Sequence, residues 1–100
     1  MRYAAKVDAN QGEIVETLRL AGYTVCLMHA VGRGFPDLLV SKSGTDKMWL
    51  LEVKTKSGKL TKPEKEWIAA WDAPVHIVRS PEEALQAVGA AIYVTGGTRS

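Results

Sequence analysis

Two apolar runs that flank a short polar loop place the strongest constraint on how this chain can fold. The first run is PDLLVSK from Pro36, the second is KMWLLEVKT from Lys47, and SGTD between them supplies turn residues. Strand-forming residues on both sides of a short loop that contains glycine are typical of a β-hairpin. Both runs are nearly continuous in apolar residues, which indicates a sheet covered on both faces. The pattern therefore predicts a hairpin within a covered sheet.

The remaining elements follow from periodicity and capping signals. Apolar residues at helical spacing, a polar cap and a terminal glycine predict a helix over residues 8–21. Ser or Thr caps predict further helices from 62 to about 72 and over 81–88. β-rich runs predict strands over 23–31 and 74–80. This order of helix, three strands, helix, strand and helix predicts an α/β fold, namely a mixed β-sheet flanked by helices.

The size and composition of the chain bound its class. One hundred residues, with 46% apolar and 24% charged side chains, predict a single domain over residues 1–95 and a flexible tail at 96–100. The single cysteine, Cys26, excludes an intrachain disulfide and is predicted to be a small core residue. No apolar stretch reaches the roughly 18 residues needed to span a bilayer, and no signal peptide is recognisable. We therefore expect a cytoplasmic location.

Two acids and a lysine interrupt the apolar runs. Side chains alternate along a strand, so Glu52 and Lys54 project on the same face. If the hairpin turns symmetrically, Asp37 faces Glu52 across the ladder, with Cβ atoms roughly 4.5 to 5.5 Å apart. Facing like charges destabilise a sheet unless something positive lies between them. Lys54 is one such partner, and a divalent cation is another, with the backbone carbonyl of Val53 as a further oxygen ligand.

A cluster of lysines follows the second run. Its members are Lys54, Lys56, Lys59, Lys62 and Lys65, with Glu64 as the one acid among them. Such a cluster either is a solvated loop or attracts a polyanion. Mg²⁺ held by few carboxylates also takes phosphate oxygens as ligands, so the two features together predict metal-dependent hydrolysis of phosphodiester bonds. In this chemistry Lys54 positions or deprotonates the nucleophile and stabilises negative charge.

The motif FPDLLV followed by LLEVK resembles that of the PD-(D/E)XK nuclease superfamily, and the order of elements around it is similar to that fold. Within the superfamily, GRGFPDLL and GKLTKPEKEW most resemble VRR-NUC domains and archaeal-type Holliday junction resolvases, many of them encoded by phages or prophages. The resemblance covers residues 8–88. It implies a Mg²⁺- or Mn²⁺-dependent DNA endonuclease, commonly a homodimer that acts on branched DNA in a bacterial or phage-infected cell. Asp37 and Glu52 then become metal ligands, and Lys54 the catalytic lysine.

The resemblance also draws attention to two helical positions where this chain departs from the pattern. Resolvases of this kind often carry a glutamate in the first helix, at the place that Gln11 occupies here. A neutral amide can hold a water on the metal but contributes no charge, and Glu13, the nearest acid, lies on a different helical face. Many VRR-NUC domains carry a glutamine at the place of Glu64, for which the sequence favours a capping box with Thr61.

Other residues have two interpretations each. The loop around Arg33, between Gly32 and Gly34, either contacts DNA, as the resemblance implies, or only connects two strands. Among the lysines, Lys56, Lys59 and Lys62 are the predicted DNA contacts. Trp67 and Trp71, one helical turn apart, are favoured as core residues over a dimer interface or a base-stacking platform. Arg79 is expected at the surface or facing a phosphate.

Three functions are compatible with these residues. The first is a structure-specific DNA endonuclease similar to junction resolvases, and the second is a nuclease for flaps, nicks or single strands that uses the same site. The third is a DNA-binding module without catalysis, in which the two acids only form an ion pair with Lys54.

Overall fold

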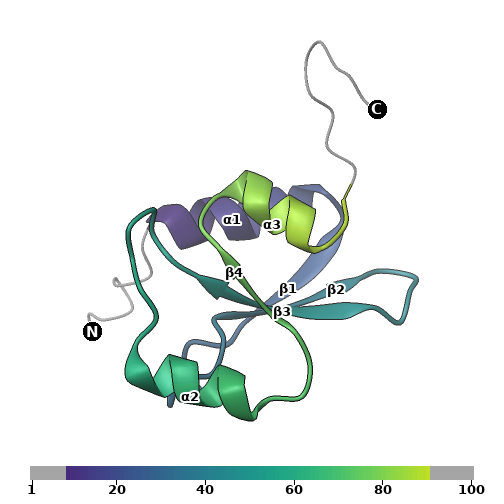
Figure 1. Cartoon of the computed structure of the whole chain (residues 1–100). Coiled ribbons are helices and arrows are strands. Elements are labelled where there is room, and N and C mark those ends of the chain that lie inside the picture. The colour runs from purple at the N-terminus through teal and green to yellow at the C-terminus, as the bar shows by residue number, and fades with distance from the viewer. Residues whose placement is uncertain (1–8, 91–100) are drawn as a thin grey trace.

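The computed structural model describes residues 9–90. Its elements are α1 (Ala9–Leu20), β1 (Tyr23–Leu27), β2 (Leu38–Lys42), β3 (Met48–Val53), α2 (Lys62–Ala70), β4 (Val75–Val78) and α3 (Pro81–Ala87). The strands form one sheet in the order β1-β2-β3-β4, in which β3 and β4 are parallel and the other pairs antiparallel. This confirms the predicted α/β fold with a mixed sheet (Figure 1). The predicted start of the first helix at residue 8, with its polar cap Asp8, and the predicted tail at 96–100 lie outside the described residues.

The first strand is shorter than predicted, because β1 ends at Leu27 and not near residue 31. The chain then forms a loop in which Gly32, Arg33 and Gly34 all have positive φ angles, of 73°, 59° and 84°. A strand requires extended backbone with negative φ, so this run cannot continue β1. The second strand, β2, begins at Leu38. Asp37 is therefore the last residue of the preceding loop and lies directly beside the first residue pair of the hairpin, Leu38 and Leu51.

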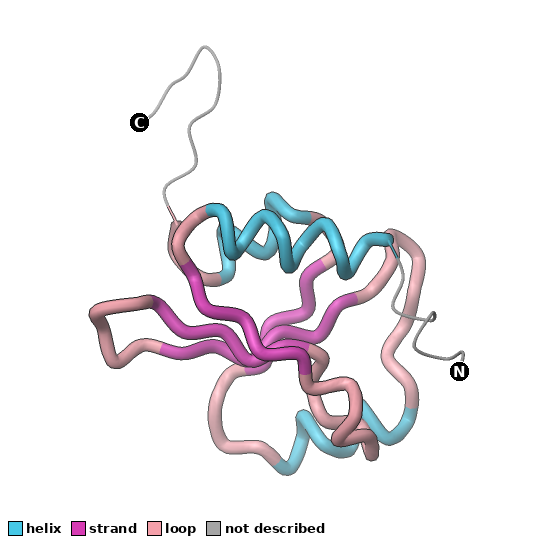
Figure 2. Tube along the Cα trace, turned by 180° about the vertical axis from the view of Figure 1, so that it is seen from behind, coloured by secondary structure: helices cyan, strands magenta, loops and turns pink. Residues whose placement is uncertain are grey.

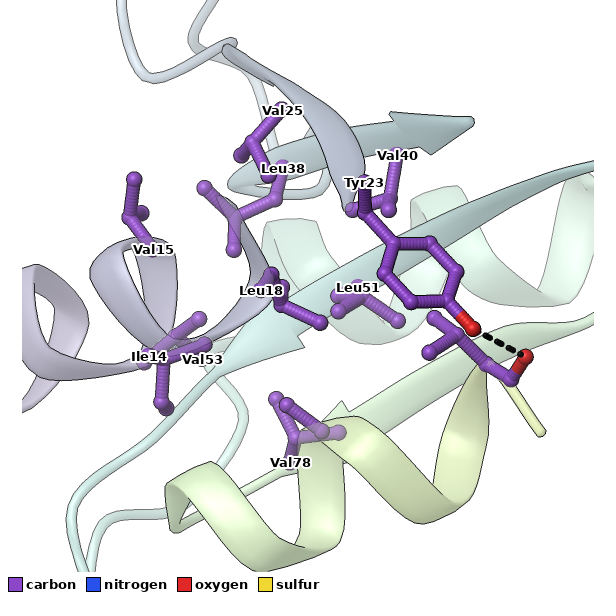
Figure 3. Packing of buried hydrophobic residues seen from close by; sticks show 12 residues of the cluster. Ile14, Val15, Leu18, Tyr23, Val25, Leu38, Val40, Leu51, Val53 and Val78 are labelled. Atoms are coloured by element: carbon purple, nitrogen blue, oxygen red, sulfur yellow. Dashed lines mark hydrogen bonds between the residues drawn. The ribbon is translucent and has the colours of Figure 1, made fainter. Parts of the chain in front are cut away.

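The two faces of the sheet are covered unequally. Helices α1 and α3 lie together on one face, while α2 lies on the other side (Figures 1 and 2). The core lies under α1 and α3, where Ile14 and Leu18 pack among strand residues such as Leu51, and the Tyr23 hydroxyl donates to the Val88 carbonyl at 3.5 Å (Figure 3). In the described residues, no helix has the length and apolar character needed to cross a bilayer.

The prediction that Cys26 is a core residue is wrong, because its side chain is exposed. Tyr23 and Val25 are the buried residues of β1. Alternation along a strand therefore turns Cys26 to the face opposite the core.

Trp67 in α2 and Trp71, the residue that caps the end of α2, also lie outside the core, so the prediction for them is wrong. Trp67 and Trp71 stack with ring centroids 4.8 Å apart, and the Phe35 ring meets Trp67 edge-on at 4.9 Å. Trp71 remains 46% exposed, and α2 has no fully buried side chain. Because α2 lies across the sheet from α1 and α3, its aromatic residues pack on each other and on the 28–37 loop.

Gly34 allows the 28–37 loop to meet α2. A Cβ atom at Gly34 would lie 2.3 Å from the Pro63 carbonyl oxygen, whereas a Cβ atom at Gly32 would meet nothing within 4 Å. Both glycines have positive φ, so alanine is strained at either position. We expect Gly34→Ala to lower the free energy of unfolding by about 1–3 kcal/mol more than Gly32→Ala, because only it adds overpacking. Urea denaturation of both variants measures the difference, and equal losses would show that the contact with Pro63 is unimportant.

Candidate active site

The β2–β3 ladder brings the two predicted acids together. Leu38 pairs with Leu51 and Ser41 with Met48, which confirms the register predicted from a symmetric turn. Asp37 and Glu52 are the next positions outward in this register, and their carboxyl groups are close enough for each to influence the pKa of the other. The half-buried Asp37, immediately before β2, and the buried Glu52, near the end of β3, therefore form one site.

Asp37 is fixed through both its backbone and its side chain. Its carbonyl accepts a hydrogen bond from the Met28 N–H at 2.8 Å, and its Oδ2 accepts one from the Val53 N–H at 2.9 Å. Val53 thus orients Asp37 with its amide group, while a metal contact from the Val53 carbonyl stays a prediction. Burial raises the pKa of Asp37, although the hydrogen bonds from Val53 and Glu52 oppose this.

Glu52 is the most deeply buried charged residue of the described chain, with 2% of its surface exposed. Burial, the hydrogen bond to Glu64 and the charge of Asp37 raise its pKa to about 8, while Lys54 opposes the rise. At neutral pH this carboxyl therefore holds a proton, which allows it to lie within hydrogen-bonding distance of other carboxyl groups. A cation that enters the site would have to displace that proton.

Lys54 is the positive partner of this site. Its Nζ lies 3.4 Å from Glu52 Oε2 and 2.7 Å from Glu64 Oε1, with 15% of the side chain exposed. Burial lowers the pKa of Lys54, but the hydrogen bond and charge of Glu64, and then Glu52, raise it, so the net direction is upward. Lys54 is therefore a protonated ammonium group here, suited to stabilising negative charge rather than to accepting a proton.

Glu64 has two roles at once. Its Oε1 accepts from the Thr61 N–H at 2.8 Å, and Thr61 Oγ1 accepts from the Glu64 N–H at 3.3 Å, which confirms the predicted capping box of α2. The same Oε1 also binds Lys54. Burial raises the pKa of Glu64, but the hydrogen bonds from Lys54 and Thr61 outweigh it and lower the pKa. The start of α2 is thus tied directly to the lysine of the site.

Helix α1 reaches the site through a residue that the sequence did not indicate. Asn10 Nδ2 donates to the Lys54 carbonyl at 2.9 Å and to the Arg79 carbonyl at 3.3 Å. A lone asparagine near a helix start carries no motif, so nothing local could have identified it. Gln11 beside it is buried and lines a hollow on α1, whereas Glu13 is exposed and lines another hollow between α1 and α3. A contact between Gln11 and a metal stays a prediction.

The predicted DNA contacts all lie at the surface. Arg33, Lys56, Lys59 and Lys62 are exposed, and in residues 9–90 the only ion pairs are those that Lys54 forms. Arg79, in contrast, is half-buried, and its guanidinium binds backbone carbonyl groups of the loop after β3. The lysines that follow the site are thus free to meet an anion.

The donor atoms of the site suit a hard divalent cation. Asp37, immediately before β2, and Glu52, on the adjacent β3, supply carboxyl oxygens. Within the described chain, no cluster of three or more His, Cys, Asp or Glu residues is arranged to hold a metal ion. Mg²⁺ commonly binds through one or two carboxylates and completes its shell with waters and substrate phosphates. The residues therefore fit Mg²⁺ or Mn²⁺ held partly by the substrate, and not an ion enclosed by protein.

Comparison of the chain with protein-family models, with curated proteins and with solved structures returned no match.

Proposed function

We propose that this chain is a Mg²⁺- or Mn²⁺-dependent endonuclease that hydrolyses phosphodiester bonds in DNA. The observation that carries the proposal is the pair Asp37 and Glu52, a half-buried and a buried carboxyl group that lie together beside the Lys54 ammonium group. Burying acids in adjacent strands is costly to the fold, and apolar residues would pack there at lower cost. A functional requirement for oxygen ligands explains why they are present.

Each residue has a separate task in this proposal. Asp37 and Glu52 would hold the cation, which would supply Lewis-acid activation of the phosphate and of the attacking water. Lys54 places a positive charge where negative charge develops on the phosphate during hydrolysis. Glu64 holds the Lys54 ammonium group in place from the start of α2.

The nature of the substrate follows from the surface beside the site. Lys56 and Lys59 follow Lys54 along the chain, and Lys62 opens α2 two residues before Glu64. Exposed lysines without ion-pair partners attract a phosphate backbone. Branched DNA as the preferred substrate, and a homodimer as the acting form, are supported by the sequence resemblance to junction resolvases.

Cleavage assays test this proposal directly. We expect the wild-type protein to nick supercoiled plasmid with Mg²⁺ or Mn²⁺ and to be inactive in EDTA. Asp37→Asn, purified in parallel, should be inactive because it removes a ligand charge, while Asp46→Asn makes the same change at an exposed turn residue and should remain active. Activity in EDTA, or equal activity of the two variants, would reject the metal site.

A panel of four-way junctions, flaps, nicked duplexes and single strands then identifies the preferred substrate. Preference for flaps, nicks or single strands would favour the second nuclease function, and a strict monomer in sedimentation would count against junction resolution, which needs two sites. The close contact between Lys54 and Glu52 is also compatible with a DNA-binding module as an alternative. Binding of DNA without cleavage in either metal would support that module.

A further inference from the structure

The side chain of Arg79 holds together the loop that carries the lysines. Its Nη1 donates hydrogen bonds to the carbonyl oxygens of Thr55 and Gly58, each at 2.7 Å, and lies 3.4 Å from that of Lys56. The Gly58 N–H donates to the Thr55 carbonyl at 3.1 Å and closes a turn. One guanidinium group thus binds three carbonyl groups of a turn more than twenty residues away in sequence.

Arg79 is itself attached to the rigid part of the fold. Its N–H donates to Glu83 Oε1 in α3 at 2.8 Å, and its carbonyl accepts from Asn10 in α1. Asn10 also binds the Lys54 carbonyl. The backbone from Lys54 to Gly58 is therefore held to α1, β4 and α3, and it does not depend on the lysine side chains for its shape.

The clamp adds a positive charge to a segment that already carries several lysines. Carbonyl oxygens need a hydrogen-bond donor, and a neutral amide side chain would supply one without adding to the repulsion among the lysines. Arg79 instead adds a positive charge, which its carbonyl partners do not neutralise. Lys56 and Lys59 stay exposed and form none of the ion pairs in residues 9–90. A shape held at the cost of uncompensated positive charge suits a polyanionic partner.

We propose that Arg79 is a positioning residue that presents the turn of residues 55–59 as a preformed contact for DNA phosphates beside the Asp37–Glu52 site. The proposal deepens the proposed function and rests on its DNA substrate. Arg79 acts through the turn and not by direct contact with DNA, because its Nη1 is already engaged with carbonyl groups. The phosphate contacts come from Lys56 and Lys59.

The salt dependence of DNA binding tests the proposal. Each phosphate contact contributes roughly 0.9 to the slope of log Kd against log salt concentration. Binding of a duplex and a four-way junction is measured in EDTA over a range of NaCl concentrations. Lys56→Ala, which removes one contact, should lower the slope by about 0.9. Arg79→Ala should lower it by about 1.8, because the displaced turn loses the contacts of both lysines.

Arg19→Ala is the matched control, since Arg19 also donates to a backbone carbonyl, that of Val25, but lies on α1. It removes an identical charge and should leave the slope unchanged. A slope for Arg79→Ala equal to that of Arg19→Ala would overturn the proposal. If Arg79→Ala lowers the slope by only about 0.9 and Arg79→Lys restores the wild-type slope, Arg79 binds DNA directly through its charge. That result would also overturn the proposal.

Hydrogen exchange supplies a readout that needs no DNA. The Gly58 amide should exchange at least about tenfold faster in Arg79→Ala than in the wild type, and it should be unchanged in Arg19→Ala. If circular dichroism shows that Arg79→Ala is unfolded, Arg79→Lys is measured in its place, and it should show a lowered slope with faster Gly58 exchange. A wild-type slope and wild-type exchange of the Gly58 amide in Arg79→Lys would then reject the positioning role.

The two proposals can fail separately. A wild-type protein that binds DNA with a slope dependent on Arg79, but cleaves nothing with Mg²⁺ or Mn²⁺, would remove the nuclease function and keep the positioning role. A protein that cleaves, but whose slope does not depend on Arg79, would remove only the positioning role. A wild-type protein that binds no DNA would remove the positioning role as well.

Discussion

Glu52→Gln is expected to abolish metal-dependent cleavage while making the folded protein more stable at pH 8. Glutamine supplies a neutral oxygen where the proposed cation needs a charged ligand. Loss of several kcal/mol of transition-state stabilisation corresponds to about 10²–10⁴-fold in rate. The fold gains at the same time, because the amide group stays neutral at every pH and has two N–H donors for the neighbouring Asp37 and Glu64 carboxyl groups, whereas a protonated carboxyl has only one O–H donor.

The gain in stability should depend on pH in a defined direction. The folded state raises the pKa of Glu52 from 4.5 to about 8, so the unfolded chain releases this proton at lower pH than the folded chain does. The stability that the carboxyl contributes is complete below pH 4.5 and is lost as the pH rises through about 8. Glutamine has no such loss. The advantage of the variant should therefore grow from pH 5 to pH 8, by up to about 1.4 kcal/mol per pH unit.

Urea denaturation at several pH values measures this difference, and plasmid nicking measures the activity. Glu66→Gln is the control, since Glu66 is an exposed carboxyl group on α2. It should leave the pH dependence and the activity unchanged. A stability difference between Glu52→Gln and the wild type that does not vary with pH would show that the buried carboxyl is not protonated, and robust cleavage by the variant would reject the metal site.

Lys54→Met should lose both activity and stability. Methionine keeps an unbranched apolar stem but removes the ammonium group that lies between Glu52 and Glu64. We expect cleavage to fall about 10²–10⁴-fold, because a preorganised positive charge is lost from the reacting phosphate. The free energy of unfolding should fall by about 1–3 kcal/mol at pH 7, less than for a fully buried pair, since the lysine and Glu64 are partly exposed.

The stability loss in Lys54→Met should shrink as the pH falls. Hydrogen bonds lower the pKa of Glu64, and the one from Lys54 has the largest effect. The stability from this contact is therefore present above pH 4.5 and is lost as the pH falls through the folded-state pKa of Glu64. Denaturation at pH 7 and at a series of pH values below 4.5 tests this. A loss that is equal at all these values would mean that the ion pair is not its cause.

Lys56→Met separates the catalytic effect from the loss of one charge in the lysine cluster. Lys56 is exposed and forms none of the ion pairs in the described residues. Its replacement should change stability by less than about 0.5 kcal/mol and should weaken DNA binding without lowering kcat. If Lys54→Met cleaved with the same kcat as Lys56→Met, Lys54 would be only another DNA contact.

The part of the candidate site within the hairpin could be predicted because it is local. A short loop between two strands sets the register, and the register places Asp37 beside Glu52 once Leu38 pairs with Leu51. The capping box of Thr61 and Glu64 spans one helical turn and was equally readable. The predictions for Cys26 and for the tryptophans failed because they required knowing which face of an element meets the core.

Sequence alone thus determined the order of the elements, the hairpin register and the facing acids, since each depends on residues a few positions apart or joined by a tight turn. Only the tertiary structure decided that Lys54 pairs more closely with Glu64 than with Glu52. The same holds for the hydrogen bond from Asn10 to the Lys54 carbonyl and for those from Arg79 to the turn of residues 55–59. These contacts join elements far apart in the chain. They depend on how α1, α2 and β4 pack around the sheet, which neither hydrophobic periodicity nor capping signals encode.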